Sequence, residues 1–390
     1  MSAPRLFKSR LIILAIILAI GVFLRLPPEL FQPNTGPLHA LESLHPRPDD
    51  QKGGYDERLY EAYAKAIGAN GLTSYPDIVR AYIEKQKTLP SSILPPLRFF
   101  YIFLAYLYHA LFSTPERTAL HYLSSIFSML TLLLSAIFAS RLGRSGYTLG
   151  VTALMAVAPT QLHMSQHGLI DGFFTFWAML ALWIAFIGVI VANRWLAFGV
   201  VTREMIIATV LGSLLGVVIL LILAGGVGSL IETYTLSVSK NYTLDYAIQT
   251  GDGPWYRYLV DLLLVSPVVL LLAIGAVFTI RREQKVEWFF ALFIAISYLI
   301  MCNIKYGMNL RYANMWDLPL RVLAFSQVLS LSRLFPRAQN WLIIGATSVL
   351  CLIEFHQYIV LAVNFPLYEL ATQYLMYALK ILKFSPQLHP

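Results

Sequence analysis

Residues 205–224 read MIIATVLGSLLGVVILLILA, a stretch without a single charged side chain. A helix of this length rises about 30 Å, the thickness of the bilayer hydrocarbon, so the stretch predicts a transmembrane helix. The whole chain has the same character: hydrophobic residues make up 57% of its 390 positions and charged residues only 13%. A soluble protein usually carries about 25% charged residues. The composition therefore argues against a soluble enzyme, excludes low-complexity disorder, and predicts a polytopic membrane protein.

Similar apolar runs along the chain predict an all-α protein with about nine transmembrane helices. They cover residues 11–26, 119–140, 146–165, 173–192, 205–224, 258–280, 287–303, 313–331 and 340–361. The first run has a basic start but no small-residue cleavage pattern after it, so we interpret it as a retained anchor. Without an internal repeat or a Gly/Ser linker, the sequence predicts one membrane domain over residues 1–390.

The positive charges lie in short clusters between the apolar runs, which predicts the sidedness of the loops. The clusters are Arg141/Arg144, Arg194/Arg203, Arg281/Arg282/Lys285 and Arg333/Arg337. All of them fall on the cytoplasmic side if the aromatic run at 97–112 lies at the outer membrane surface instead of crossing. Segments 27–118, 225–257 and 304–312 are then extracytoplasmic, and we expect juxtamembrane helices in the first of them. This pattern explains the net charge of +8 without a nucleic-acid partner.

Two adjacent carboxylates, Asp56 and Glu57, open a segment whose periodicity predicts a helix over residues 56–69. Acidic residues at a helix start can simply accept backbone N–H bonds and favour the helix dipole. Alternatively, a carboxylate near the membrane surface can act as a base toward an acceptor hydroxyl or amine. The residues alone leave both interpretations open.

A second polar cluster contains His163, His167 and Asp171. At spacings of i, i+4 and i+8, these residues would share one face of a single helix. A His/His/Asp set could hold a divalent metal, but hydrogen-bonded histidines at an interfacial helix end are the more common arrangement. A divalent metal is therefore a possible cofactor, and no cofactor is certain.

A third cluster places Lys305, Arg311 and Tyr312 just before an apolar run, on the predicted outer side. Such residues can anchor a helix at the interface. Arginine can also fork two N–H bonds to a phosphate, which makes Arg311 the first candidate for phosphate binding and Lys305 the second. Lys85 and Arg98 in the first outer segment are further candidates.

Ordered short motifs over most of the chain resemble the GT-C superfamily of membrane glycosyltransferases. The nearest branch is that of protein O-mannosyltransferases and lipid A aminoarabinose transferases. The motifs are Arg25-Leu26, Asp56-Glu57 with Tyr60, Leu94-Pro95-Pro96-Leu97, Ala119-Leu120-His121-Tyr122-Leu123, Arg141-Leu142-Gly143-Arg144, Ala158-Pro159, Ser165-Gln166, Asp171, Gly253-Pro254-Trp255-Tyr256 and Arg311-Tyr312. Their order and spacing together carry the resemblance, since each motif is weak alone.

The resemblance implies transfer of a sugar from an undecaprenyl- or dolichyl-phosphate carrier to a glycan, lipid or protein acceptor, with inversion at the anomeric carbon. Asp56 matches the catalytic carboxylate of the family, Glu57 its neighbour and Asp171 the second acidic position. We expect Arg58, Tyr60, Tyr312 and His167 to contact substrate. The expected location is a bacterial inner membrane, with the active site on its extracytoplasmic face.

The chain departs from the family pattern in ways that leave carrier binding and acceptor type open. One span lies between Trp195 and Gly225, where relatives usually have three, and Gln166 stands where they have an arginine. No soluble domain is expected after the last span. Two alternatives remain: a transporter or flippase of lipid-linked sugars, and a non-catalytic protein of the same fold.

Overall fold

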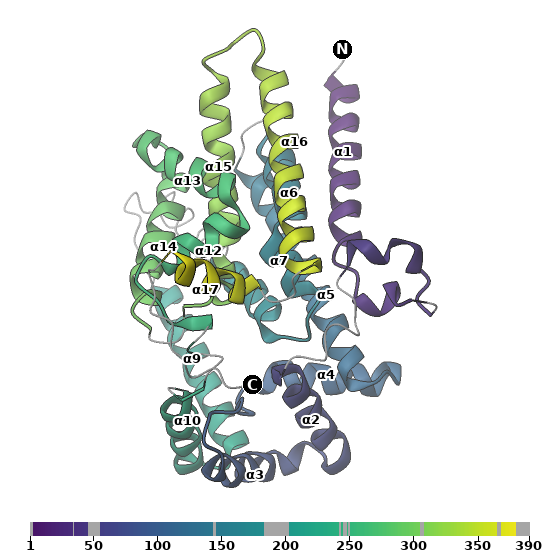
Figure 1. The fold of residues 1–390 in the computed structure, drawn as a ribbon, viewed down its shortest axis with the longest axis vertical. Helices are drawn as coiled ribbons and strands as arrows, with labels where there is room; N and C mark the ends of the chain where they lie inside the picture. The colour runs from purple at the N-terminus through teal and green to yellow at the C-terminus, as the bar shows by residue number, and fades with distance from the viewer. Residues whose placement is uncertain are drawn as a thin grey trace. The chain divides into compact units, whose positions relative to one another are not determined.

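The structure is a computed structural model that describes residues 3–33, 35–45, 55–142, 146–182, 203–241, 243–244, 248, 250–304, 308–364 and 368–379. Every regular element among these residues is a helix and none is a strand, which confirms the predicted all-α class (Figure 1). The chain forms two compact units. Unit 1 consists of Met1–Lys52, Ser125–Gln166 and Asp245–Pro390, and unit 2 consists of Gly53–Ser124 and His167–Leu244. A single domain over residues 1–390 stays a prediction.

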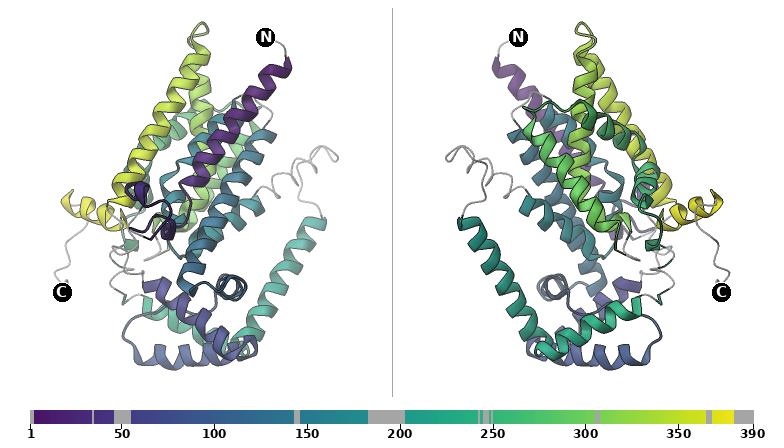
Figure 2. Two further views of the ribbon diagram at one scale, coloured as in Figure 1. Left: turned by 90° about the vertical axis from the view of Figure 1, so that its right-hand side faces the viewer. Right: turned by 90° about the vertical axis from the view of Figure 1, so that its left-hand side faces the viewer.

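Unit 1 is built from long and short helices that pack against one another. They are α1 (Ala3–Phe23), the later part of α5 (Glu116–Arg141), α6 (Tyr147–Ala156), α7 (Pro159–Ser165), α12 (Arg257–Val265), α13 (Pro267–Thr279), α14 (Lys285–Met301), α15 (Asp317–Ser332), α16 (Gln339–Tyr358) and α17 (Tyr368–Ala378). Helix α6 contacts α1 and α15, and α15 also contacts α13, α14 and α16. The start of α1 and the turn between α15 and α16 lie at the same end of this unit, consistent with the charge pattern (Figures 1 and 2).

Two of the predicted spans, 146–165 and 258–280, are each broken into two helices. The first is interrupted before Pro159 and the second at Ser266 before Pro267. Proline has no N–H to donate and its ring clashes with the preceding turn, so each proline begins a new helix. The length of each apolar run therefore overstates the length of its helices, because the run continues through the proline that breaks it.

The carbonyl groups at the end of α6 are capped by an arginine in the turn that follows α1. Arg25, which is 1% exposed, donates from Nη1 to Ala156 O at 2.8 Å and from Nη2 to Met155 O at 2.7 Å. The last carbonyls of a helix have no partner within it, and a cation there also complements the helix dipole. This arginine therefore stabilises the interruption between α6 and α7 and fixes α1 against it.

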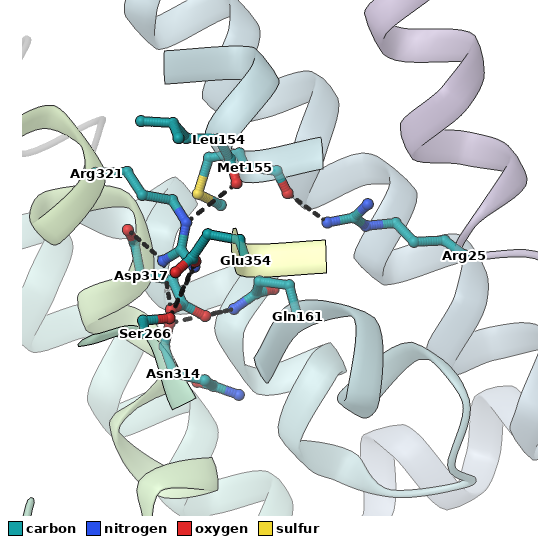
Figure 3. Close-up of polar contacts among 9 residues, drawn as sticks. All are labelled: Arg25, Leu154, Met155, Gln161, Ser266, Asn314, Asp317, Arg321 and Glu354. Atoms are coloured by element: carbon teal, nitrogen blue, oxygen red, sulfur yellow. Dashed lines mark hydrogen bonds and ion pairs between the residues drawn. The ribbon is translucent and has the colours of Figure 1, made fainter. Parts of the chain in front are cut away.

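A buried ion-pair group joins α15 to α16 (Figure 3). Arg321 is fully buried and pairs with Asp317 Oδ1 at 2.7 Å and with the carboxylate of Glu354. Gln161 Nε2 donates to Asp317 at 2.8 Å, and Ser266 Oγ donates to Glu354 at 3.0 Å. Buried charges persist only when they are paired and hydrogen-bonded. The guanidinium of Arg321 meets this condition, because it is paired with two carboxylates.

Unit 2 contains the helices of the segment in which juxtamembrane helices are expected, and their position at a membrane stays a prediction. It contains α2 (Tyr55–Asn70), α3 (Tyr75–Thr88), α4 (Phe99–Phe112), the first residues of α5, the helix Ile170–Leu182, α9 (Arg203–Ala224) and α10 (Val227–Asn241). Helix α2 confirms the helix expected from residue 56 onward. Gly225 and Gly226, with φ of 79° and 125°, allow the reversal from α9 to α10 beside α3, which Figure 2 shows.

Three helices in the described part of the chain are long and apolar enough to cross a membrane: Glu116–Arg141, Ile206–Ala224 and Gln339–Val363. In α9, Leu211, Leu215 and Ile222 are each more than half exposed, as expected of side chains that face lipid. Helix α4, with 14 residues, is about 21 Å long, too short to cross the hydrocarbon. The figure of about nine spans stays a prediction, and part of the run at 173–192 lies outside the described residues.

Candidate functional site

The two carboxylates at the start of α2 occupy different environments. Asp56 is half-buried, whereas Glu57 is only 1% exposed. Both lie in the first turn of the helix, where a negative charge favours the dipole. Because solvent reaches only Asp56, it is the carboxylate of this pair that a substrate could contact.

Glu57 is held by groups from two distant parts of unit 2. The backbone N–H of Gly168 donates to Glu57 Oε1 at 2.7 Å across 111 positions of sequence. His167 Nδ1 lies 3.5 Å from Oε1, and His121 Nε2 lies 3.8 Å from Oε2. Burial alone would raise the pKa of Glu57, but the contacts with the two histidines outweigh it and hold the pKa below its usual value. Glu57 is therefore an ionised anchor for the segment around Gly168.

This anchored segment corrects the prediction that His163, His167 and Asp171 share one helical face. Helix α7 ends at Ser165, residues 166–168 bend, and a new helix begins at Ile170. A Cβ atom on Gly168 would lie 3.0 Å from Leu120 Cβ and 3.2 Å from His121 Cδ2, so the backbone passes close to α5 here. The contacts that Gly168 makes with distant residues favour the bend over a continued helix.

Tyr60 lies at the centre of a second set of contacts in unit 2. Its side chain is fully buried, and Arg98 Nη1 donates a hydrogen bond to its hydroxyl. The same guanidinium carbon lies 5.9 Å from the centre of the Tyr60 ring, a cation–π distance. The ring of Tyr101 packs against Tyr60 edge-on, with 5.2 Å between centroids. Tyr60 is thus fixed on both its polar and apolar sides.

The charges around Tyr60 show that Asp56 and Asp171 occupy one neighbourhood. Burial raises the pKa of Tyr60 most strongly, and the guanidinium of Arg98 opposes this effect. The negative charges of Asp56 and Asp171 each make a smaller contribution that also raises the pKa of Tyr60. Asp171 is 7% exposed and follows the bend that Glu57 anchors. Unit 2 therefore places Arg98 in contact with Tyr60, and the charges of Asp56 and Asp171 also act on this tyrosine.

The remaining predicted site residues are distributed elsewhere. Arg311 and Tyr312 belong to unit 1, where Arg311 Nη2 donates to Tyr312 Oη at 3.2 Å and the guanidinium lies 5.1 Å from the ring centre. Lys305 lies outside the described residues. Arg58 on α2 and Lys85 on α3 are exposed. Of the four phosphate-binding candidates, Arg98 is the one that unit 2 places at Tyr60.

The structure also bears on the metal hypothesis. Among the residues that it describes, no three His, Cys, Asp or Glu side chains are grouped so that they could hold a metal ion. His163 is buried in unit 1, while His167 contacts Glu57 in unit 2. The donor set that the helical spacing suggested is therefore divided by the bend at residues 166–168.

Sequence reasoning missed two kinds of residue. His121 was noted only as part of a motif, although its position at the start of a predicted span next to an outer loop was a usable signal. The buried group of Asp317, Arg321 and Glu354 was missed as well, although ionisable residues inside apolar runs are uncommon and mark functional or structural sites.

Comparisons with models of protein families, with curated proteins and with solved structures give no match for this chain.

Proposed function

We propose that this chain is an integral membrane glycosyltransferase that takes a sugar from a polyprenyl-phosphate carrier and transfers it to an extracytoplasmic acceptor. The observation that carries the proposal is that Glu57, next to Asp56, accepts a hydrogen bond from Gly168, three residues before Asp171, while Arg98 bonds Tyr60 one turn further along α2. Two carboxylates and a cation around a substrate site supply the groups that a displacement at an anomeric carbon needs. The GT-C-like order of motifs supports the same activity.

In the proposed reaction, Asp56 removes the proton from the acceptor hydroxyl as the hydroxyl oxygen attacks the anomeric carbon. The new C–O bond forms as the bond from that carbon to the phosphate oxygen breaks, and the electron pair leaves with the polyprenyl phosphate. Attack and departure occur on opposite faces of the sugar, which inverts the anomeric configuration. Asp171 orients the acceptor beside Asp56.

A cation must stabilise the charge that develops on the leaving phosphate. Arg98 is the candidate that unit 2 supplies, because its guanidinium donates to the hydroxyl of Tyr60, one turn along α2 from Asp56. Arg311 and Lys305 remain candidates from the third sequence cluster. Glu57 and His167 act as positioning residues, because the contacts of Glu57 are made to the segment that carries Asp171.

The test is a transfer assay with the purified full chain and a panel of radiolabelled prenyl-phosphate sugars, in which loss of label from the carrier is measured. We expect Asp56→Asn to reduce the rate by about 10²–10⁴, the range for removal of a general base. Asp77→Asn is the matched control, because Asp77 lies in the same unit but is 63% exposed and pairs only with Arg80 at the surface. Full activity in Asp56→Asn would remove the base assignment, and inactivity of the wild type toward every carrier would remove the proposal.

Transport of a lipid-linked sugar is the second candidate, and the buried group in unit 1 favours it. Ionisable residues at membrane depth mark ion and substrate pathways in transporters, and Asp317, Arg321 and Glu354 lie within the predicted spans. Liposomes that contain the protein and a fluorescent lipid-linked sugar distinguish the two functions. A transporter would move the lipid across the bilayer faster than protein-free liposomes and would be unaffected by Asp56→Asn.

A further inference from the structure

A polar pocket opens where the end of α13, the end of α15 and the start of α6 meet in unit 1. Its cavity volume is about 40 Å³ and it is partly open to solvent, so it suits one small charged group and not a whole ligand. Its polar lining includes Thr279, Arg281, Gln284, Ser326, Ser330 and Arg333. None of these residues belongs to the candidate site in unit 2.

Some arginines in the described part of the chain are paired with carboxylates and others are not. Arg321 and Arg117 each form an ion pair with a carboxylate. Arg281 and Arg333 line the same pocket from two different helix ends, and neither guanidinium has an ion-pair partner among the described residues. Two guanidinium groups in the wall of one pocket, neither paired with a carboxylate, are suited to a phosphate, whose oxygens accept forked N–H bonds.

The acidic residue nearest to the pocket is already satisfied from its own surroundings. Glu287 is 2% exposed and accepts hydrogen bonds from Tyr147 Oη at 3.1 Å, Gln284 Nε2 at 3.1 Å and Ser326 Oγ at 3.3 Å. Its charge opposes an anion, but the surrounding ends of α13, α14 and α15 are strongly basic. Residues 281–287 and 333–337 contain five basic and two acidic side chains, so the local potential remains positive.

Large apolar side chains flank the pocket and indicate where it lies relative to lipid. Phe278 is 84% exposed, Leu334 70% and Phe335 61%. Phe278 lies three residues before Arg281, and Leu334 and Phe335 follow Arg333 directly. The two arginines therefore lie near exposed apolar side chains, which favour contact with lipid over water. Basic pockets at helix ends beside lipid-facing surfaces are the setting in which anionic headgroups bind.

We propose that this pocket binds a phosphate anion, held between Arg281 and Arg333 and presented by the headgroup of an anionic phospholipid. The site is separate from the proposed transfer reaction and does not depend on it. A phosphate on an acyl-chain lipid would place its chains along the exposed apolar residues at 278 and 334–335. Inorganic phosphate offers the same chemistry without the chains, so the two sources can be told apart.

The experiment compares thermal unfolding of the full chain in detergent with added phosphatidylglycerol, phosphatidylcholine or inorganic phosphate. We expect phosphatidylglycerol to raise the midpoint of the wild type by about 5 °C at saturation and phosphatidylcholine to have no effect. Arg281→Gln with Arg333→Gln should lose at least four-fifths of that shift. The control pair, Arg282→Gln with Arg337→Gln, removes the same charge from exposed neighbours outside the pocket and should keep the shift.

Each outcome decides one point. Equal loss of the shift in both double variants would show general surface attraction and overturn the proposal, as would the lack of any shift in the wild type. An equal shift with inorganic phosphate would keep the pocket but make a soluble anion its ligand. Where the glutamine pair unfolds without lipid, Arg281→Lys with Arg333→Lys preserves the charge, and a shift as large as the wild type's would refute forked recognition.

Discussion

Replacing Glu57 with glutamine tests the anchor that places Asp171. The side chain keeps its shape and one acceptor oxygen, so the N–H of Gly168 can still donate to it at a distance near 2.7 Å. The negative charge is lost, and with it the attraction to His167 and His121, which lie 3.5 and 3.8 Å away. The variant therefore removes the electrostatic part of the anchor and leaves the packing in place.

The expected cost follows from the strength of the bonds that change. A hydrogen bond to a charged group contributes about 1.5–3 kcal/mol, and one between neutral groups contributes about 0.5–1.5 kcal/mol. One bond of the first kind becomes one of the second kind at a side chain that is 1% exposed, so little solvent screening reduces the difference. We expect the free energy of unfolding to fall by about 1–2 kcal/mol.

Chemical unfolding in detergent micelles, followed by intrinsic fluorescence, measures this difference. Glu61→Gln is the control, because Glu61 lies one turn further along α2 and pairs with Lys65 and Arg117 at the partly exposed surface. Surface pairs of this kind contribute about 0–1 kcal/mol. A loss in Glu57→Gln no greater than that in Glu61→Gln would refute the anchor.

The pH dependence of unfolding gives an independent check on the same residue. The pKa of Glu57 in the folded protein lies below its ordinary value of 4.5, so its contribution to stability is fully present above pH 4.5 and is lost as the pH falls through the folded pKa. Glutamine does not titrate. The difference in stability between wild type and Glu57→Gln should therefore shrink as the pH is lowered below 4.5, and a constant difference would show that the charge is not the cause.

Three further variants address the other contacts. Arg321→Met leaves two buried carboxylates without their cation and should cost about 3–5 kcal/mol in unfolding free energy, whereas Arg282→Met at an exposed position should cost less than about 0.5 kcal/mol. Arg98→Lys should lower carrier affinity less than Arg98→Ala in an equilibrium binding assay, because lysine keeps the charge and loses the fork. Gly168→Ala should lower the melting temperature, because its Cβ would lie 3.0 Å from Leu120 Cβ in a backbone held by Glu57.

The apolar runs predict the position of several helices, and they fail where a proline or a distant residue ends a helix. The apolar runs at 205–224 and 340–361 correspond to α9 and α16. The run at 146–165 does not form one helix, because Pro159 breaks it and Arg25 caps the end of its first half from 131 positions away in the chain. A residue that distant leaves no mark in a window of local sequence.

The candidate site shows the same division between local and distant causes. Asp56 and Glu57 were identifiable because they open a periodic helix, which depends on neighbouring residues only. Their different roles were not identifiable, since the burial of Glu57 results from His121 and Gly168. Spacing in the sequence suggested one face for the polar residues of 163–171, and a tertiary hydrogen bond gave them another arrangement.

The adjacency of Asp56 and Glu57 has a consequence for how the proposed reaction is controlled. One residue supplies the base, and the next holds the segment that leads to Asp171, so the two aspartates are positioned from a single helix turn. A loosened anchor would move Asp171 relative to Asp56 without changing the base itself. Above pH 4.5, where Glu57 is ionised, Glu57→Gln should then lower the transfer rate by a similar factor at each pH, whereas a change in the base would shift the pH at which the rate is half-maximal. A shifted pH profile in this variant would mean that Glu57 acts on the proton transfer and not on the geometry.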